Sequence, residues 1–201
     1  MMSKARLAIR LSRLLVFNSP NIREEQYPTD SEIAAEAIWA AYMNKDIEGN
    51  LVADLGAGTG ILGIAALELG AKKVLFVERD RDAIGILKSN LDGYDKSRYS
   101  TICSDISEFK KEVDTVIMNP PFGTREKHAD REFLLKAFSS SKSIYSFHKN
   151  STSAFIGRIS AANGFQLTQK KDFKFPLKQA YSFHRSRIRR IDVSLFVLKK
   201  A

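Results

Sequence analysis

The chain has 201 residues, of which 44% are hydrophobic and 27% are charged, the composition of an ordinary globular protein of one domain. Its 32 lysines and arginines outnumber 23 acids and give a formal charge of +9, which suggests a polyanionic partner. A single cysteine excludes an internal disulfide framework, and no apolar run approaches the ~20 residues of a membrane helix, so we expect a cytoplasmic protein with no membrane contact.

The first 23 residues are basic and contain no acid. An organellar transit peptide has this arginine-rich, acid-poor composition. A pattern typical of function begins almost at once, at Gln26, so we favour a basic helical extension of the mature protein over residues 1–25. No repeat or linker divides the chain, which predicts one domain over residues 1–201.

Strands and helices alternate along the rest of the chain. A Thr-x-x-Glu capping box at 29–32 predicts a helix that ends near Met43. This alternation predicts a doubly wound α/β sheet, mostly parallel, with helices on both faces and a terminal antiparallel hairpin. Ligands of such sheets bind beyond the carboxyl ends of the strands. The seven predicted strands are 51–55, 73–78, about 99–103, 113–118, 143–147, 165–175 and 191–199.

A glycine-rich turn follows the first predicted strand and opens a helix. Gly56, Gly58 and Gly60 allow a sharp turn and a close approach to a ligand. Glu78 ends the next strand, where its carboxylate could accept both hydroxyls of a ribose. The spacing fits NAD as well as S-adenosylmethionine, and a purely structural turn with a solvated glutamate is the third alternative.

The run Asp54-x-Gly-x-Gly-x-Gly resembles the first motif of class I S-adenosylmethionine-dependent methyltransferases, which have a Rossmann-like fold. The resemblance implies that the glycine turn passes the methionyl-ribose part of the donor and that Asp54 lies near its amino group. It also implies that Asp105 accepts a hydrogen bond from the donor's adenine and that Ile106 packs on the ring. Taken alone, an aspartate such as Asp105 is more often a helix cap.

The fourth predicted strand ends in Asn119-Pro120-Pro121-Phe122. This tetrapeptide resembles the motif of amino-group methyltransferases, which act on adenine N6, guanine N2 or glutamine N5. The side-chain oxygen of Asn119 and the carbonyl of Pro120 could accept the hydrogens of the target amine and aim its lone pair at the methyl group. The two prolines stiffen the loop, and Phe122 would stack on a planar base. The alternative is a strand that ends at prolines beside a buried Phe122.

Four segments together make the chain similar to archaeal-type members of the methyltransferase-like family whose eukaryotic representative makes N6-methyladenosine in ribosomal RNA. This similarity implies donor contacts by Gln26 and Thr29, and backbone contacts at Thr59 and Ile61. Glu78 replaces the family's aspartate and keeps the carboxylate. The eukaryotic representative depends on a small zinc-binding activator subunit, and no Cys/His cluster in this chain predicts a metal site of its own. The four segments are 25–29, 118–124, 145–149 and 180–184.

The segment 173–191 is basic, contains no acid and carries interleaved aromatic residues. Such a run is usually a solvated face, but arginine and lysine also bind phosphates and aromatic rings stack on bases. We therefore predict that it binds the substrate. The predicted substrate contacts are Phe122, His148, Lys149, Tyr181, His184, Arg185 and Arg187.

The sequence thus predicts methyl transfer from S-adenosylmethionine to adenine N6 in structured RNA, most naturally ribosomal RNA. Three alternatives stay open at this point. They are methylation of glutamine N5 in a protein, as release-factor methyltransferases do, methylation of DNA adenine, and a non-catalytic RNA-binding or assembly protein on the same fold.

Overall fold

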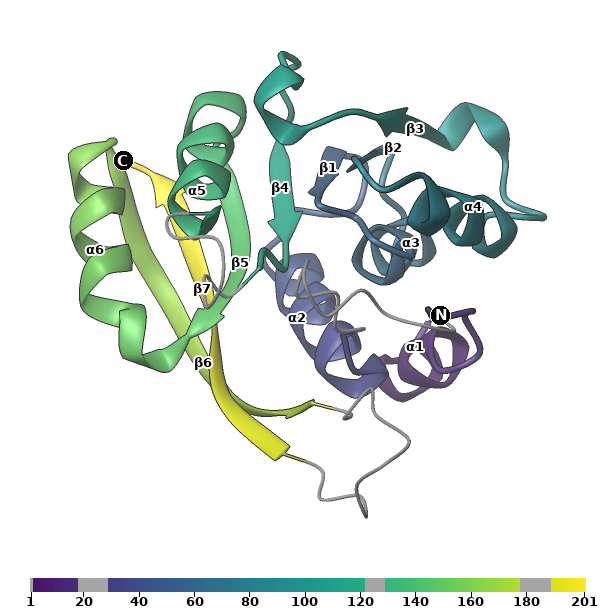
Figure 1. Ribbon diagram of the computed structural model, residues 1–201, viewed down its shortest axis with the longest axis horizontal. Helices are drawn as coiled ribbons and strands as arrows, with labels where there is room; N and C mark the ends of the chain where they lie inside the picture. Colours follow the sequence, from purple (N-terminus) through teal and green to yellow (C-terminus); the bar gives the residue numbers. More distant parts are fainter. Residues whose placement is uncertain (1, 18–28, 122–128, 178–188) are drawn as a thin grey trace.

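A computed structural model describes residues 2–17, 29–121, 129–177 and 189–201 of the chain (Figure 1). The strands are β1 (Leu51–Leu55), β2 (Lys73–Glu78), β3 (Tyr99–Cys103), β4 (Thr115–Met118), β5 (Ser143–Lys149), β6 (Phe165–Leu177) and β7 (Arg189–Lys200). The helices are α1 (Lys4–Leu11), α2 (Ser31–Met43), α3 (Ile61–Glu68), α4 (Arg81–Asn90), α5 (Ala129–Ser140) and α6 (Ser153–Ala162). None of the helices in these ranges is long and apolar enough to cross a membrane.

The seven strands form one sheet in the order β3-β2-β1-β4-β5-β7-β6. Strands β1 to β5 are parallel, and β7 runs antiparallel to both β5 and β6. The predicted mostly parallel sheet with a terminal antiparallel hairpin is therefore confirmed. Because the last strand inserts beside β5, β6 lies at the edge of the sheet.

Two hydrophobic cores cover the two faces of the sheet, because successive side chains of a strand point to opposite faces. Val52 and Val74 pack under α1, α2 and α3, whereas Ala53 and Leu75 pack under α5 and α6. The N-terminal helix belongs to the first core, where its apolar side contacts α2 and α3. The predicted helix within residues 1–25 thus forms, and it is an integral part of the packing.

Helix α2 begins one residue later than the capping box predicts. Its N-cap is Asp30, whose carboxylate accepts hydrogen bonds from the backbone N–H groups of Glu32 and Ile33 at 2.9 and 3.3 Å. The hydroxyl of Thr29 accepts a hydrogen bond from Asn119 instead. A carboxylate caps the positive end of a helix well, so Asp30 takes this role and leaves Thr29 to the site.

The hairpin of β6 and β7 reaches past the carboxyl ends of the parallel strands. The pairing of β5 with β7 ends at Lys149 and Val193, while β6 and β7 continue to pair as far as Leu177 and Arg189. The first residues of β7 therefore extend beyond the sheet edge at which the ligands of such folds bind. These residues belong to the predicted substrate-binding segment 173–191.

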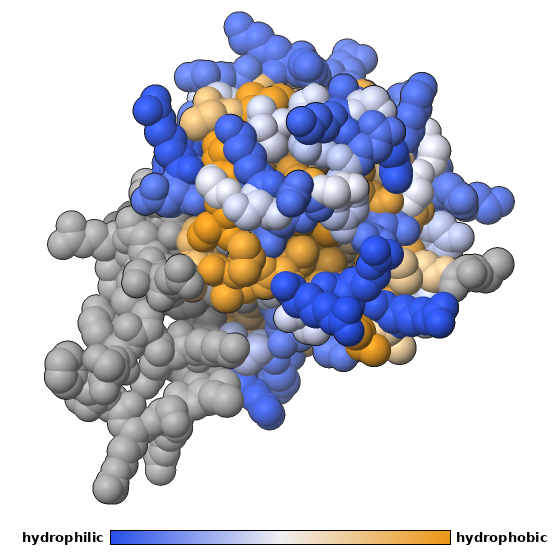
Figure 2. Space-filling model, turned by 90° about the vertical axis from the view of Figure 1, so that its right-hand side faces the viewer, coloured by the Kyte–Doolittle hydropathy of each residue, from blue (hydrophilic) through white to orange (hydrophobic). Residues whose placement is uncertain are grey.

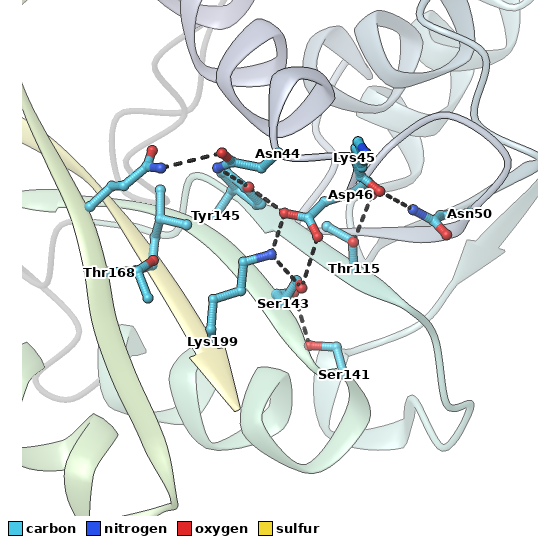
Figure 3. Close-up of polar contacts among 12 residues, drawn as sticks. Asn44, Lys45, Asp46, Asn50, Thr115, Ser141, Ser143, Tyr145, Thr168 and Lys199 are labelled. Atoms are coloured by element: carbon cyan, nitrogen blue, oxygen red, sulfur yellow. Dashed lines mark hydrogen bonds and ion pairs between the residues drawn. The ribbon is translucent and has the colours of Figure 1, made fainter. Parts of the chain in front are cut away.

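A polar cluster around Asp46 lies at the amino ends of the parallel strands, opposite the carboxyl ends (Figure 3). Its carboxylate accepts hydrogen bonds from Tyr145 and Ser143 and forms an ion pair with Lys199, and its backbone carbonyl accepts from Thr115 at 2.7 Å. Burial, followed by the hydrogen bond to Asp46, raises the pKa of Tyr145. The cluster joins β4, β5 and β7 to the loop after α2, and it lies far from the carboxyl ends.

Candidate active site

Three polar side chains lie at the carboxyl ends of neighbouring strands, which together form one edge of the sheet, called here the carboxyl edge. Asp54 lies in β1, Glu78 ends β2, and Asn119 follows β4 directly. Strand β1 pairs with β2 on one side and with β4 on the other. The sheet therefore brings these three residues to one edge, as the sequence predicted.

Asp54 is buried, and its carboxylate accepts a hydrogen bond from the backbone N–H of Gly63 at 2.8 Å. Burial raises the pKa of Asp54 to about 7, the Gly63 hydrogen bond opposes this effect, and the charge of Glu78 adds to it. With this pKa, about half of the Asp54 carboxyls are ionised near neutral pH, and a nearby cationic group would stabilise the ionised form. The predicted partner, the amino group of the donor, is such a cation.

Glu78 shapes the glycine turn as well as facing the predicted ribose position. Its carboxylate accepts hydrogen bonds from the backbone N–H groups of Gly58 at 2.8 Å and Asp80 at 2.9 Å. The turn also donates from the backbone of Gly56 to the carbonyl of Val77 at 2.9 Å. Each carboxylate oxygen has a second lone pair, so both oxygens can still accept hydroxyl groups.

Two glycines of the turn have different structural reasons to lack a side chain. Gly60 has φ +92°, and a Cβ there would lie 2.3 Å from the Cδ1 of Leu87. Among the described residues, a Cβ at Gly58 would meet nothing closer than the ring of Phe17, at 3.9 Å, so these residues leave room for a ligand on this side of the turn. Thr59 between them is buried, and Ile61 begins α3, so the predicted donor contacts of this pair would come from backbone atoms.

Asp105 follows β3 and caps the short 3-10 helix Ile106–Glu108. Its carboxylate accepts a hydrogen bond from the N–H of Ser107 at 2.9 Å, and this interaction lowers the pKa of Asp105. The side chain is about half exposed and lies 3.9 Å from the guanidinium of Arg79. The cap role is therefore present, while the predicted contacts of Asp105 and Ile106 with an adenine ring stay predictions.

Asn119 presents a buried hydrogen-bond acceptor that is not satisfied. Its Nδ2 donates to the hydroxyl of Thr29 at 2.9 Å, which fixes the orientation of the amide. The opposite atom, Oδ1, is buried and accepts no hydrogen bond from the part of the chain that the structure describes. A buried unsatisfied acceptor is costly, so it usually has a function. The following Pro120 is buried and Pro121 is partly buried, which holds the end of β4 in place.

The structure places His148 in the interior of the sheet. It is 2% exposed, and its Nε2 lies 2.6 Å from the hydroxyl of Ser146. Burial lowers the pKa of His148 to about 3, so the ring is neutral at physiological pH. A direct contact with a substrate is not visible in this arrangement, and the role of His148 stays a prediction. Its neighbour Lys149 is partly exposed at the end of β5.

Several predicted site residues lie outside the described ranges, and their roles stay predictions. Within the described ranges, no group of three or more His, Cys, Asp or Glu side chains could hold a metal ion. The residues outside the ranges are Gln26, Phe122, Tyr181, His184, Arg185 and Arg187.

Asn90, at the end of α4, was missed by the sequence reasoning. Its Nδ2 donates to the carbonyls of Thr59 at 2.9 Å and Leu15 at 3.0 Å, and its Oδ1 accepts from the N–H of Leu15 at 2.8 Å. One buried amide therefore ties the glycine turn to the segment after α1. The signal in the sequence was weak: a polar residue among the apolar positions of an amphipathic helix.

We expect Asn90→Ala to weaken donor binding about tenfold, because each buried group left without its partner costs roughly 1–3 kcal/mol. The loss should affect the position of Thr59 and thus the turn around the donor. Titration calorimetry with S-adenosylmethionine measures the change. Ser89→Ala is the matched control, because within the described part of the chain its exposed hydroxyl donates only to the carbonyl of Gly85 in the same helix. An unchanged donor affinity in Asn90→Ala would show that the turn holds its shape without this amide.

Comparisons with known proteins show what the whole chain is similar to. The family model of the methyltransferase small domain matches residues 32–143. The chain is 34% identical over 188 residues to the rRNA N(6)-adenosine-methyltransferase Mettl5 of Drosophila melanogaster, which covers 90% of this chain and 88% of that protein. It is 36% identical to the Danio rerio protein of the same description, over 85% of this chain and 86% of that one. A solved structure from Pyrococcus horikoshii, provisionally described as an RNA methyltransferase, superposes with a TM-score of 0.92 and 45% identity, over 100% and 99% of the two chains.

Proposed function

Because the chain belongs to the methyltransferase small domain family, with relatives that methylate ribosomal RNA, we propose that it methylates the N6 amino group of an adenosine in structured ribosomal RNA. The observation that carries the proposal is the buried, unsatisfied Oδ1 of Asn119 at the end of β4, because methylation of an amine needs such an acceptor beside the methyl group.

The residues at the carboxyl edge fit S-adenosylmethionine as the methyl donor. We propose that Asp54 holds its amino group, that Glu78 accepts its ribose hydroxyls, and that the open side of Gly58 lets the backbone approach it. Asp105 and Ile106 would bind its adenine, next to β3. When bound, the donor supplies a methyl group on a positively charged sulfur, which is a good leaving group.

The chemistry assigned to this chain is the positioning of a weak nucleophile. The lone pair of an adenine amino group is delocalised into the ring. Asn119 Oδ1 and the carbonyl of Pro120 would accept its two hydrogens, so that the nitrogen becomes tetrahedral and its lone pair points along the line of attack. The N–C bond forms as the C–S bond breaks, and the nitrogen, now acidic, loses one proton to water. Positioning and electrostatic stabilisation provide the catalysis, and no strong base is required.

The test is methyl transfer from labelled S-adenosylmethionine to deproteinised ribosomal RNA, followed by digestion to nucleosides, with protein and DNA fractions tested as substrates in parallel. Label in N6-methyladenosine supports the proposal. Label in a protein fraction would indicate glutamine methylation instead, and label in DNA would indicate the DNA alternative. Donor binding without transfer would indicate a required partner, such as the zinc-binding activator that the resemblance implies. No donor binding would leave only a non-catalytic role.

The raised pKa of Asp54 predicts how donor binding depends on pH. As the pH rises through about 7, Asp54 gains its negative charge, while the amino group of the donor stays positive up to its own pKa of about 7.7–8.0. Donor affinity should therefore increase severalfold between about pH 6 and 7.5. Calorimetry across this range measures the trend, and Asp54→Asn should abolish it.

Stability should change in the opposite direction, falling between about pH 4 and 7. A carboxyl with a raised pKa stabilises the fold in its neutral form, so this contribution is complete below the unfolded value of about 3.9 and is lost as the pH rises to about 7. Opposite trends in donor affinity and melting temperature separate binding by Asp54 from a general effect of pH on folding. A donor affinity that is flat in the wild type would contradict the assignment.

A further inference from the structure

The N-terminal helix is amphipathic in an unusual way for a packed helix. Leu7, Ala8 and Leu11 are buried in the core, while the outer side is basic and exposed. No acidic residue occurs anywhere in the first 23 residues. The exposed side therefore carries positive charge without neutralisation from its own segment. The basic residues of this helix and the turn after it are Lys4, Arg6, Arg10 and Arg13.

Only part of this charge is paired. Lys4 forms an ion pair with Glu36, and Arg10 forms one with Glu68. Arg6 and Arg13 are exposed, and within the described ranges neither forms an ion pair. These two guanidinium groups are therefore free to bind an anion from outside the protein. A guanidinium binds phosphate oxygens through two parallel N–H donors.

Helix α1 is connected to the candidate active site by the segment that follows it. The segment after it reaches the glycine turn, because Asn90 bonds both Leu15 and Thr59 and because the ring of Phe17 faces Gly58. Figure 1 shows α1 at the end of the molecule toward which β4 points, and the end of the β6–β7 hairpin at Leu177 and Arg189 lies at the same end. The basic helix thus flanks the edge of the sheet where the substrate would bind.

The helix and the hairpin also form one surface. Lys4 of α1 and Lys171 of β6 both form ion pairs with Glu36 of α2, so the two basic elements are neighbours across a single carboxylate. On the side of the molecule that carries α1, α3 and α4, hydrophilic and hydrophobic surface alternate (Figure 2). Ile9, at 55% exposure, and Leu15, at 57%, add apolar area among the arginines. Interleaved cations and apolar groups suit a nucleic acid, which offers phosphates and base faces.

We propose that α1 and the segment up to Phe17 are an RNA-binding surface, which holds the phosphates that flank the target adenosine and continues onto the β6–β7 hairpin. This inference rests on the proposed function, since it takes RNA as the substrate. It adds Arg6 and Arg13 to the substrate contacts, which the sequence reasoning placed mainly in residues 173–191. It also predicts that the surface acts on binding and not on the chemical step.

The test is the double charge reversal Arg6→Glu with Arg13→Glu. The matched control is Lys72→Glu with Lys142→Glu. These two lysines are exposed, they directly precede β2 and β5 and so lie at the amino ends of the strands, and their substitution changes the net charge by the same amount. The probe is labelled, deproteinised ribosomal RNA, measured by filter retention at several salt concentrations. Loss of two phosphate contacts should lower the slope of log affinity against log salt by about 1.4–1.8 and reduce affinity at least tenfold at low salt.

Methyl transfer in the same preparations separates the possible failures. We expect the KM for RNA to rise in the α1 variant, with kcat at saturating RNA and the donor Kd unchanged, and with melting temperatures equal in both variants. If RNA affinity fell equally in the control variant, the change in net charge would explain the loss, and the proposal would be overturned. Unchanged RNA affinity would also overturn it and point to a protein partner for this surface. If the wild type neither binds the donor nor makes N6-methyladenosine, the proposed function fails. If the wild type methylates RNA and reversal of Arg6 and Arg13 changes neither RNA affinity nor KM, only this inference is refuted.

Discussion

Replacement of Asn119 by alanine should lower the rate of methyl transfer about 10²- to 10³-fold, the usual effect of removing one positioned hydrogen-bonding group from an active site. The substitution removes the buried Oδ1, which is the only side-chain acceptor proposed for the target amine. It also frees the hydroxyl of Thr29. Donor affinity should stay close to the wild-type value, because Asn119 is not one of the proposed donor contacts, and those at Asp54, Glu78, the glycine turn, Asp105 and Ile106 are left intact. Single-turnover transfer of label to RNA measures the chemical step directly.

Two further variants test whether the acceptor oxygen itself is responsible. Asn119→Asp keeps an acceptor at the same position, and the hydroxyl of Thr29 can donate to it, so we expect this variant to retain most of the activity that alanine loses. Thr29→Val leaves Oδ1 in place but removes its orienting partner, so a loss of about tenfold is expected. If Asn119→Ala transferred methyl groups within a few-fold of the wild-type rate, the proposed role of the loop would be wrong.

Gly63→Ala should destabilise the protein by about 1–3 kcal/mol, although alanine normally favours a helix. A Cβ at this position in α3 would lie 2.2 Å from the Cε1 of Phe76 and 2.8 Å from its Cζ. The ring is fully buried in the core under α3, so it cannot move without displacing its neighbours. The N–H of Gly63 also donates to Asp54, so a shift of α3 should weaken donor binding as well. Thermal and urea unfolding measure the first effect, and calorimetry measures the second.

Gly85→Ala is the control, and it should have the opposite sign. Gly85 is exposed in the middle of α4, and apart from its chain neighbours and the backbone of α4 no heavy atom of the described residues lies within 4 Å of the position of its missing Cβ. Alanine there should raise the free energy of unfolding by about 0.5–1 kcal/mol, because glycine loses more backbone entropy on folding. If both variants changed stability in the same direction, close packing of α3 on Phe76 would not explain the glycine at position 63.

Residues close together in the sequence were predicted well. The alternation of apolar strands with helical segments, the glycine turn after β1 and the prolines after β4 are local patterns, and their chemistry follows from residue type and spacing. Because parallel strands align their carboxyl ends, the meeting of Asp54, Glu78 and Asn119 at one edge also followed from the order of the elements. The fold and the outline of the site were therefore contained in the sequence.

Contacts between distant residues were decided by the tertiary structure alone. Thr29 and Asn119 are 90 positions apart, and Asn90 bonds Leu15 across 75 positions, so no local pattern indicates that they meet. The cap of α2 moved to Asp30 for the same reason, since Asn119 engages the hydroxyl of Thr29. The sequence by itself determined the elements, their order and the residue types of the site. Packing determined which polar groups are satisfied, and so left Asn119 Oδ1 without a partner among the described residues and brought the segment after α1 to the glycine turn.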